Sequence, residues 1–137
     1  MAILGAIPVL NCHSIDASLS FYTQLLQFVV VNKREREGRL DWVHLMHGET
    51  TLMLQVATEA LGSQTTQSSG PSLEDASSNI RQSPISLYFF VTDIKDLHHF
   101  VKAKNNSVSA LKETDYRMQE FSMSDPEGNT VTFGQKN

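Results

Sequence analysis

Short apolar runs alternate with polar stretches along this chain, and their period changes between strand-like and helix-like segments. In the first half, runs rich in Val, Leu and Thr predict strands over residues 6–12, 28–34, 41–47 and 50–56. Leu19, Tyr22 and Leu26 recur at helical spacing and predict a helix over residues 14–26, between the first two strands.

The second half repeats this order of elements. Apolar runs predict strands over residues 85–92, 107–111, 118–123 and 129–134. Ile94, Leu97, Phe100 and Val101 form an apolar stripe that predicts a helix over residues 93–104. The order strand, helix, strand, strand, strand therefore occurs twice, and one such unit alone would cover its sheet face poorly.

Polar residues at the expected boundaries provide caps and turns. Ser14 or Asp16 is expected to cap the first helix, and Asp93 the second. The segment 125–129, Asp-Pro-Glu-Gly-Asn, lies between two alternating apolar runs and predicts a hairpin turn. Pro presets φ, Gly supplies a positive φ, and Asp and Asn side chains can bond to the local backbone.

Residues 59–83 differ from the rest, since Ser, Thr, Gln, Gly and Pro dominate them. We interpret them as a long linker with one helical turn near residues 73–76, either a plain spacer or a segment that folds over a site. We expect a single domain over residues 1–137, with module one at 1–58 and module two at 84–137. The predicted fold class is α+β: two βαβββ modules forming a curved mixed sheet around a hollow, with helices outside.

Composition narrows the function classes. With 40% hydrophobic and 19% charged residues, a chain of 137 residues can bury a core. The net charge of -4 and the lack of a basic stripe argue against nucleic acid as a partner. The densest basic patch, Lys33-Arg34-Glu35-Arg36, is interrupted by glutamate, and we interpret it as a solvated strand end.

The expected environment is the cytoplasm. Cys12 is the only cysteine, which excludes an intramolecular disulfide, and its apolar surroundings predict a buried side chain. The start of the chain lacks the pattern of a signal peptide, and no apolar run is long enough to span a membrane.

Several short motifs, in this order and spacing, resemble the vicinal oxygen chelate superfamily, which includes glyoxalase I, extradiol dioxygenases and fosfomycin and bleomycin resistance proteins. The matching segments are Ile7-Pro8-Val9-Leu10, Ser18-Leu19-Ser20-Phe21-Tyr22, Leu25-Leu26-Gln27-Phe28, Trp42-Val43-His44-Leu45, Leu52-Met53-Leu54, Phe90-Val91-Thr92-Asp93 and the turn at residues 125–129. The resemblance covers nearly the whole chain outside the linker, and it implies the same two-module fold.

In metal-dependent members of that superfamily, four strands each supply a metal ligand to the hollow. The resemblance places these positions at Ile7, Met53, Ser86 and Thr132. None is a usual ligand of Mn, Fe, Ni or Zn, which bind His and carboxylate side chains. We therefore expect no metal and no other cofactor.

Strand alternation divides the remaining side chains between two faces. The helix-covered face is predicted to carry Leu10, Leu52, Leu54, Leu87, Phe89, Val91, Phe121, Met123, Val131 and Phe133. The opposite face is predicted to line the hollow and to supply the ligand-binding residues Ile7, Trp42, His44, Met46, Met53, Ser86, Tyr88, Phe90, Met118, Glu120 and Thr132. Aromatic, apolar and a few polar side chains together are typical of small-molecule sites, although they could equally pack at a sheet or dimer interface.

These observations favour a metal-free small-molecule-binding protein similar to bleomycin resistance proteins. The expected ligand is apolar, aromatic or cationic, and the expected assembly is a homodimer, with the modules paired within one chain or across two. The alternative is a lyase, isomerase or dioxygenase of the same superfamily that uses unusual ligands or acid–base chemistry by Glu120 and His44. A third reading is an interaction module whose hollow is filled by a partner chain.

Overall fold

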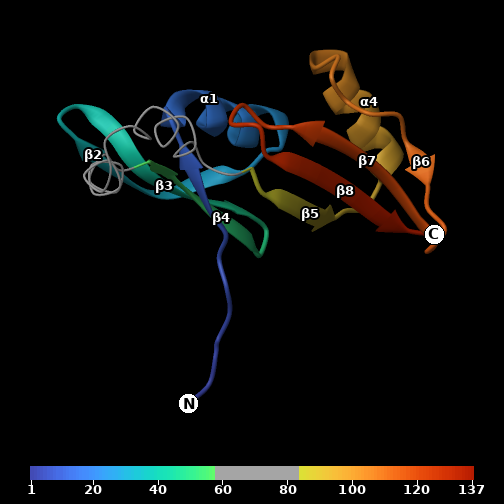
Figure 1. The fold of residues 1–137 in the computed structure, drawn as a ribbon, viewed down its shortest axis with the longest axis horizontal. Coiled ribbons are helices and arrows are strands. Elements are labelled where there is room, and N and C mark those ends of the chain that lie inside the picture. The colour runs from blue at the N-terminus through green and yellow to red at the C-terminus, as the bar shows by residue number, and fades with distance from the viewer. Residues whose placement is uncertain (58–83) are drawn as a thin grey trace, which may run out of the picture. The chain divides into compact units, whose positions relative to one another are not determined.

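The computed structural model describes residues 1–57 and 84–137, so the predicted linker and its helical turn lie outside the described residues (Figure 1). The chain divides into two compact units, Met1–Ser83 and Pro84–Asn137, and each is described by itself. Both consist of a four-stranded mixed sheet with a helix, which confirms the α+β fold class with two modules.

The first unit has the strand–helix–strand–strand–strand order predicted from the sequence. Its elements are β1 (Val9–Cys12), α1 (Ile15–Ser20), β2 (Val29–Arg36), β3 (Arg39–His47) and β4 (Thr50–Val56). Helix α1 continues into a five-residue π-helix, η1 (Phe21–Leu25). The sheet order is β1-β4-β3-β2, with β1 parallel to β4 and the other pairs antiparallel.

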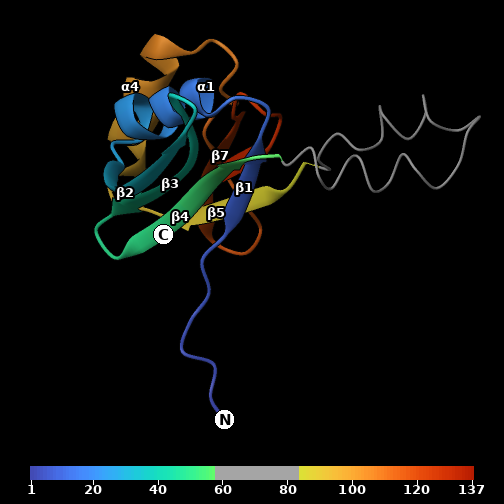
Figure 2. The same ribbon diagram turned by 90° about the vertical axis from the view of Figure 1, so that its left-hand side faces the viewer.

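The core of this unit lies between α1 and one face of the sheet, against β3 and β4 (Figure 2). Tyr22, Leu45, Leu52 and Leu54 are fully buried there, as the alternation of apolar positions predicts. Cys12 is buried as well, as expected for a cysteine among apolar neighbours.

The second unit repeats the topology. Its elements are β5 (Ser86–Phe90), α4 (Ile94–Lys104), β6 (Lys112–Glu113), β7 (Met118–Ser124) and β8 (Thr130–Lys136). The sheet order is β5-β8-β7-β6, with β5 parallel to β8. Helix α4 packs on β7 and β8, where Ile94, Val101, Phe121 and Val131 are buried. Within the described ranges, no helix is long and apolar enough to cross a membrane.

The predicted strand over residues 107–111 is wrong, because the strand here is the two-residue β6 at Lys112–Glu113. The preceding segment still lies beside β7. The N–H of Ser109 donates to the carbonyl of Ser122 at 2.9 Å, and the Ser109 hydroxyl accepts from the N–H of Ser122 at 2.8 Å. The Ser109 hydroxyl thus takes the place of a backbone carbonyl as the acceptor for Ser122. The backbone groups of Ser122 are therefore hydrogen-bonded although residues 107–111 do not form a regular strand.

Ser14 and Asp93 occupy the N-cap positions but do not cap through their side chains, and Asp16 lies in the first turn of α1. Neither Ser14 nor Asp93 makes a side-chain capping hydrogen bond, and Asp93 has left-handed backbone angles of φ 53° and ψ 48°. The N–H of Ile94 instead donates to the side-chain oxygen of Gln135 on β8 at 2.8 Å. A backbone N–H group at the start of α4 therefore gains its hydrogen bond from a residue far away in sequence, and local sequence patterns do not reveal such a partner.

The turn at residues 125–129 forms as predicted. Asp125 Oδ1 accepts from the N–H groups of Glu127 and Asn129, each at 2.9 Å, and Asp125 Oδ2 accepts from the Asn129 side chain at 2.9 Å. Gly128 has φ 87°, a value that glycine adopts without strain. Asn129 Oδ1 also accepts from the N–H of Ile85 at 2.9 Å, so the turn anchors the segment that leads into β5.

Candidate functional site

The open face of the first sheet, opposite α1, carries the ligand-binding residues predicted for module one. Register pairs His44 with Met53 across β3 and β4, and Trp42 with Gln55 on the same face. Trp42, His44, Met46 and Met53 are all half-buried. Ile7 precedes β1 and is 40% exposed, so it lies beyond the end of the strand in which it was predicted.

On this face, the side chain of His44 has a ring nitrogen without a hydrogen-bond partner among the described residues. Its Nε2 is buried and has no hydrogen-bond partner among the described residues, and its ring lies 6.3 Å from that of Trp42. His47 points to the other face, where its Nδ1 lies 3.2 Å from the carbonyl of Leu26. The two histidines therefore lie on opposite faces of β3, as strand alternation predicts.

The open face of the second sheet, opposite α4, carries the residues predicted for module two. Tyr88 pairs with Thr132, and Ser86 with Thr130, across β5 and β8. Glu120 pairs with Gly134 across β7 and β8. Met118 lies at the start of β7 on the same face and is half-buried.

Three side chains on this face form a hydrogen-bonded polar group, which we call the Glu120 cluster: Glu120, Tyr88 and Tyr116. The hydroxyls of Tyr88 and Tyr116 both donate to Oε2 of Glu120, each at 2.6 Å. The carboxylate side chain is only 7% exposed. Sequence reasoning missed Tyr116, because it lies between β6 and β7 and outside any periodic run.

A glycine makes this cluster possible. A Cβ placed on Gly134 of β8 would overlap the hydroxyl and ring of Tyr88. Glycine inside a strand often marks such a close approach of another group to the backbone. Tyr88 on β5 therefore lies over β8 and reaches Glu120 on β7.

The cluster holds Glu120 as an anion. The hydrogen bonds from Tyr116 and Tyr88 lower the pKa of the Glu120 carboxyl, against the opposing effect of burial, and the charge of Lys112 lowers it further. Burial, the hydrogen bond to Glu120 and the Glu120 charge raise the pKa of Tyr88 to about 12. At neutral pH the tyrosines are therefore donors and the carboxylate is the acceptor.

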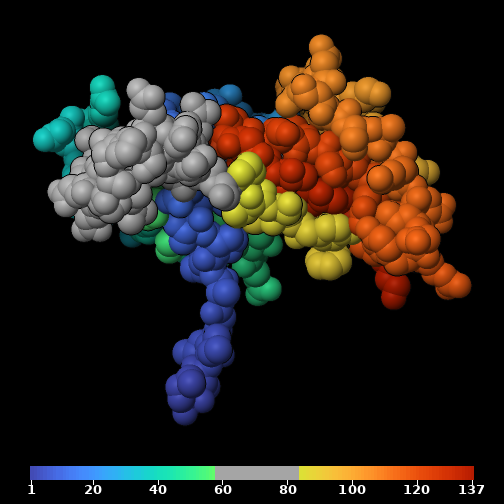
Figure 3. Space-filling model, in the orientation of Figure 1, coloured from blue at the N-terminus to red at the C-terminus, as the bar shows by residue number. Residues whose placement is uncertain are grey.

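Beside the cluster, β5 presents aromatic surface. The rings of Tyr88 and Phe90 lie 5.2 Å apart, and Phe90 is 81% exposed. β5 is an edge strand of its sheet, and the yellow segment around it lies at the surface in the space-filling view (Figure 3). An exposed aromatic pair next to a buried carboxylate suits recognition of a ligand that is both aromatic and polar.

The four positions that the resemblance predicts for metal ligands carry side chains that do not fit a divalent ion. Ile7 offers no donor atom, Met53 offers a thioether, and Ser86 and Thr132 offer hydroxyls. The Thr132 hydroxyl is also hydrogen-bonded to that of Ser122 at 2.9 Å. Across residues 1–57 and 84–137, no three His, Cys, Asp or Glu side chains converge as a metal site would require.

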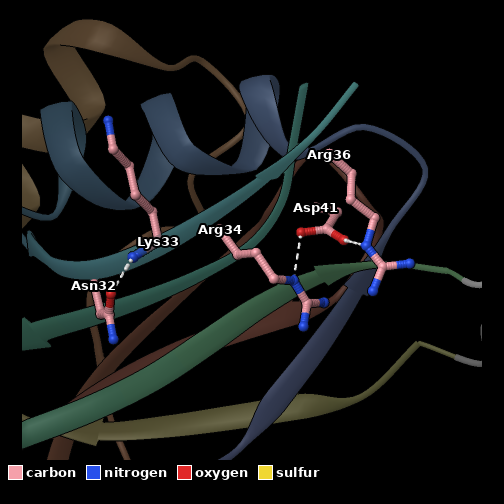
Figure 4. A network of polar contacts seen from close by, with 5 residues as sticks. All are labelled: Asn32, Lys33, Arg34, Arg36 and Asp41. Atoms are coloured by element: carbon pink, nitrogen blue, oxygen red, sulfur yellow. Dashed lines mark hydrogen bonds and ion pairs between the residues drawn. The ribbon is translucent and has the colours of Figure 1, made fainter. Parts of the chain in front are cut away.

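A hollow lies within the first unit, at the ends of β2, β3 and β4. It is lined by charged residues that include Arg34, Arg36 and Asp41. Arg34 Nε and Arg36 Nε lie 2.9 Å and 3.2 Å from the two Asp41 oxygens (Figure 4). The Arg34 hydrogen bond lowers the pKa of the Asp41 carboxyl. Both arginines are exposed, in keeping with a solvated strand end.

Comparison with known families identifies the class of protein that this fold defines. The model of the Glyoxalase/Bleomycin resistance protein/Dioxygenase superfamily matches residues 6–133. The chain belongs to this superfamily. Among curated proteins, no match was found.

Three solved structures illustrate the similarity. The first is TnmS3, an antibiotic binding protein from Streptomyces sp. CB03234, with a TM-score of 0.67 and 15% identity over 100% of this chain and 99% of the other. A bleomycin-binding protein complexed with bleomycin has a TM-score of 0.65 and 17% identity over 98% and 100%. A lactoylglutathione lyase from Agrobacterium tumefaciens has a TM-score of 0.66 and 15% identity over 98% and 95%. At these identities the likeness shows the fold alone, which binding proteins and enzymes share.

Proposed function

We propose that this protein binds a small apolar, aromatic or cationic molecule without a metal and without catalysing a reaction. The observation that carries the proposal is the chemistry of the open sheet faces. They combine aromatic and thioether side chains with one buried carboxylate, while the family's metal positions hold Ile7, Met53, Ser86 and Thr132. Apolar surface with a few oriented polar groups is the usual composition of a small-molecule site.

The names of two similar structures also support a binding function. One is an antibiotic binding protein, and another is complexed with bleomycin. Binding of this kind needs only a complementary surface. Trp42 on the first sheet and Tyr88 and Phe90 on the second supply flat rings for a planar ligand, and Met46, Met53 and Met118 supply adaptable contacts.

Assembly and location belong to the same proposal. We propose a homodimer in the cytoplasm, because modules of this superfamily pair to enclose a ligand and the chain has a single buried cysteine. The hollow between modules remains a prediction. Light scattering coupled to size exclusion should give a mass near twice 15.3 kDa, and a monomeric mass at micromolar concentration would contradict the dimer.

The test of the proposed function uses the full chain without an affinity tag. Isothermal titration with bleomycin, 2-naphthylmethanol and protonated 2-naphthylmethylamine should give saturable binding of at least one probe. Binding should be unchanged after treatment with EDTA, and elemental analysis should find no stoichiometric divalent metal. A stoichiometric metal whose removal abolishes binding would contradict the proposal.

The alternative is an enzyme of the superfamily that uses acid–base chemistry. The observation in its favour is the buried Nε2 of His44, which lacks a partner among the described residues and could exchange a proton with a substrate. Any turnover of a thiohemiacetal or catechol substrate should then be lost in His44→Gln and in Glu120→Gln. Turnover that survives both substitutions would exclude these residues as catalytic.

A further inference from the structure

The Glu120 cluster contains a buried negative charge that no positive charge pairs. Both hydrogen bonds to this carboxylate come from neutral tyrosine hydroxyls and end on Oε2. Arg34 and Arg36 both pair with Asp41, and across the described ranges no ion pair reaches Glu120. An ionised carboxylate removed from water without a cation is costly, and hydrogen bonds offset only part of that cost.

The residue best placed to pair with it is Lys112, which stands opposite Glu120 in the register of β6 and β7. Lys112 is exposed and makes no ion pair with Glu120, although its charge contributes to the low pKa of that carboxyl. A lysine that stays in water leaves the carboxylate available to another cation.

Tyr116 is the side chain that a ligand can displace from this carboxylate. It is 61% exposed, yet its hydroxyl donates to the same Oε2 that Tyr88 contacts from the sheet. Its turn is held by backbone bonds from Thr114 N to Met118 O at 2.7 Å and from Arg117 N to Thr114 O at 3.3 Å. Because these bonds do not involve the Tyr116 side chain, rotation of the side chain alone can uncover Glu120.

We propose that Glu120 anchors the protonated amine of an aromatic ligand, that the amine replaces the Tyr116 hydroxyl at the carboxylate, and that Tyr88 and Phe90 contact the aromatic part. This inference rests on the proposed binding function and names the ligand class. A primary ammonium group supplies both the missing charge and a hydrogen bond to the carboxylate, whereas a neutral ligand supplies at most a hydrogen bond. Phe90, which is 81% exposed, offers an open ring face for the cation or the ligand ring.

The test compares two probes of equal shape on the full chain at pH 7: protonated 2-naphthylmethylamine and neutral 2-naphthylmethanol. Dissociation constants come from amide chemical shifts in NMR titrations. The amine should bind about tenfold more tightly than the alcohol, which is the difference expected of a charge-assisted hydrogen bond over a neutral one. Glu120→Gln, which keeps an acceptor for Tyr88, should remove that preference.

Glu113→Gln is the matched control. It removes the same charge from an exposed position on β6, and its hydrogen bond from Asn137 Nδ2 can be retained by the amide oxygen. The preference for the amine should survive this substitution. Tyr116→Phe should tighten binding of the amine by roughly threefold to tenfold, since the competing hydroxyl is gone, and Tyr88→Phe should not tighten it.

The outcomes separate the two proposals. Equal binding of both probes, or a preference that survives Glu120→Gln, overturns the anchor while leaving small-molecule binding in place. Weaker binding of the amine in Tyr116→Phe overturns the displacement. If neither probe nor bleomycin binds, the proposed function and this inference both fail. Should Glu120→Gln not fold, the two-probe comparison on the native chain and on Tyr116→Phe still decides the matter.

Discussion

The hydroxyl of Tyr88 on β5 donates to Oε2 of Glu120 on β7 at 2.6 Å, across the intervening strand β8. The bond spans three strands of one sheet and passes over Gly134, the position where β8 has no side chain. This hydrogen bond therefore requires three features together: the long side chain of Tyr88, a glycine at position 134 and the buried carboxylate of Glu120.

Gly134→Ala should therefore destabilise the protein. The new Cβ would overlap the Tyr88 hydroxyl and ring, and we expect a loss of about 1–3 kcal/mol in the free energy of unfolding, as is usual for overpacking. Urea denaturation followed by circular dichroism measures it. In a Tyr88→Ala background the same substitution should cost much less, and an equal cost in both backgrounds would show that Tyr88 is not the obstacle.

The Glu120 carboxylate should make stability depend on pH in the acidic range. Hydrogen bonds from Tyr116 and Tyr88 lower its pKa in the folded state, so its contribution is present above the ordinary pKa of 4.5 and is lost as pH falls through the lowered value. The difference in unfolding free energy between the native chain and Glu120→Gln should shrink as pH falls below the ordinary pKa of 4.5. A difference that stays constant from pH 7 to pH 3 would contradict this linkage.

Tyr88 should give the opposite dependence at high pH. Its folded pKa is raised to about 12, so the stability that depends on its protonated hydroxyl is present below the ordinary value of 10.0 and is lost as pH rises through about 12. The pKa of Tyr116 is raised as well, by its hydrogen bond to Glu120, so Tyr116→Phe is the matched control. Ultraviolet difference spectra at the phenolate band should show an ionisation near pH 12 in the folded protein, which should be lost in Tyr88→Phe and should persist in Tyr116→Phe.

Substitution of Asp125 in the turn should lower the stability of the fold more than most single substitutions do. Asp125 is buried and accepts three hydrogen bonds, so Asp125→Ala leaves those donors without partners and should cost about 2–3 kcal/mol. Asp125→Asn keeps one acceptor oxygen for the two backbone N–H groups and should cost less. Thermal denaturation of both variants gives the order, and a larger loss for the asparagine variant would contradict it.

Treatment with a chelator should leave the folded protein unchanged. Ile7, Met53, Ser86 and Thr132 do not form a donor set for Mn, Ni or Zn, so EDTA should shift the melting temperature by less than about 1 °C. Added Mn²⁺ or Ni²⁺ should produce no saturable shift. A saturable rise at micromolar metal would reveal ligands other than these four.

Several features of the fold follow from local patterns alone. The two-residue alternation in β4 locates Thr50–Val56 correctly, and the helical spacing of Ile94 and Val101 locates α4 to within one residue. The turn at residues 125–129 forms the bonds that its residue types predict. These features depend on residues close together in sequence, so the sequence carries their full signal.

Features that depend on distant contacts escaped prediction. The cap of α4 comes from Gln135, and the segment before β6 is bonded through the Ser109 side chain rather than as a strand. Tyr116 belongs to the Glu120 cluster although nothing in its neighbourhood in the sequence marks it. The first two interactions join residues whose proximity is created by strand pairing, and single-sequence periodicity does not specify partners across strands. Tyr116 contacts a residue only four positions away, but it does so from a turn outside any periodic run.

By itself, the sequence determined the α+β class, the repeated order of elements, the buried faces of β1, β4, β7 and β8, and the absence of usual ligands at Ile7, Met53, Ser86 and Thr132. These follow from periodicity and residue chemistry. Only the tertiary structure decided that Tyr88 crosses Gly134 to reach Glu120, that Tyr116 joins them, and that the carboxylate is buried with no cation paired to it among residues 1–57 and 84–137. The reason is physical: burial, hydrogen bonding and charge pairing are properties of side chains brought together by the folded sheet, and they exist only once its strands are in register.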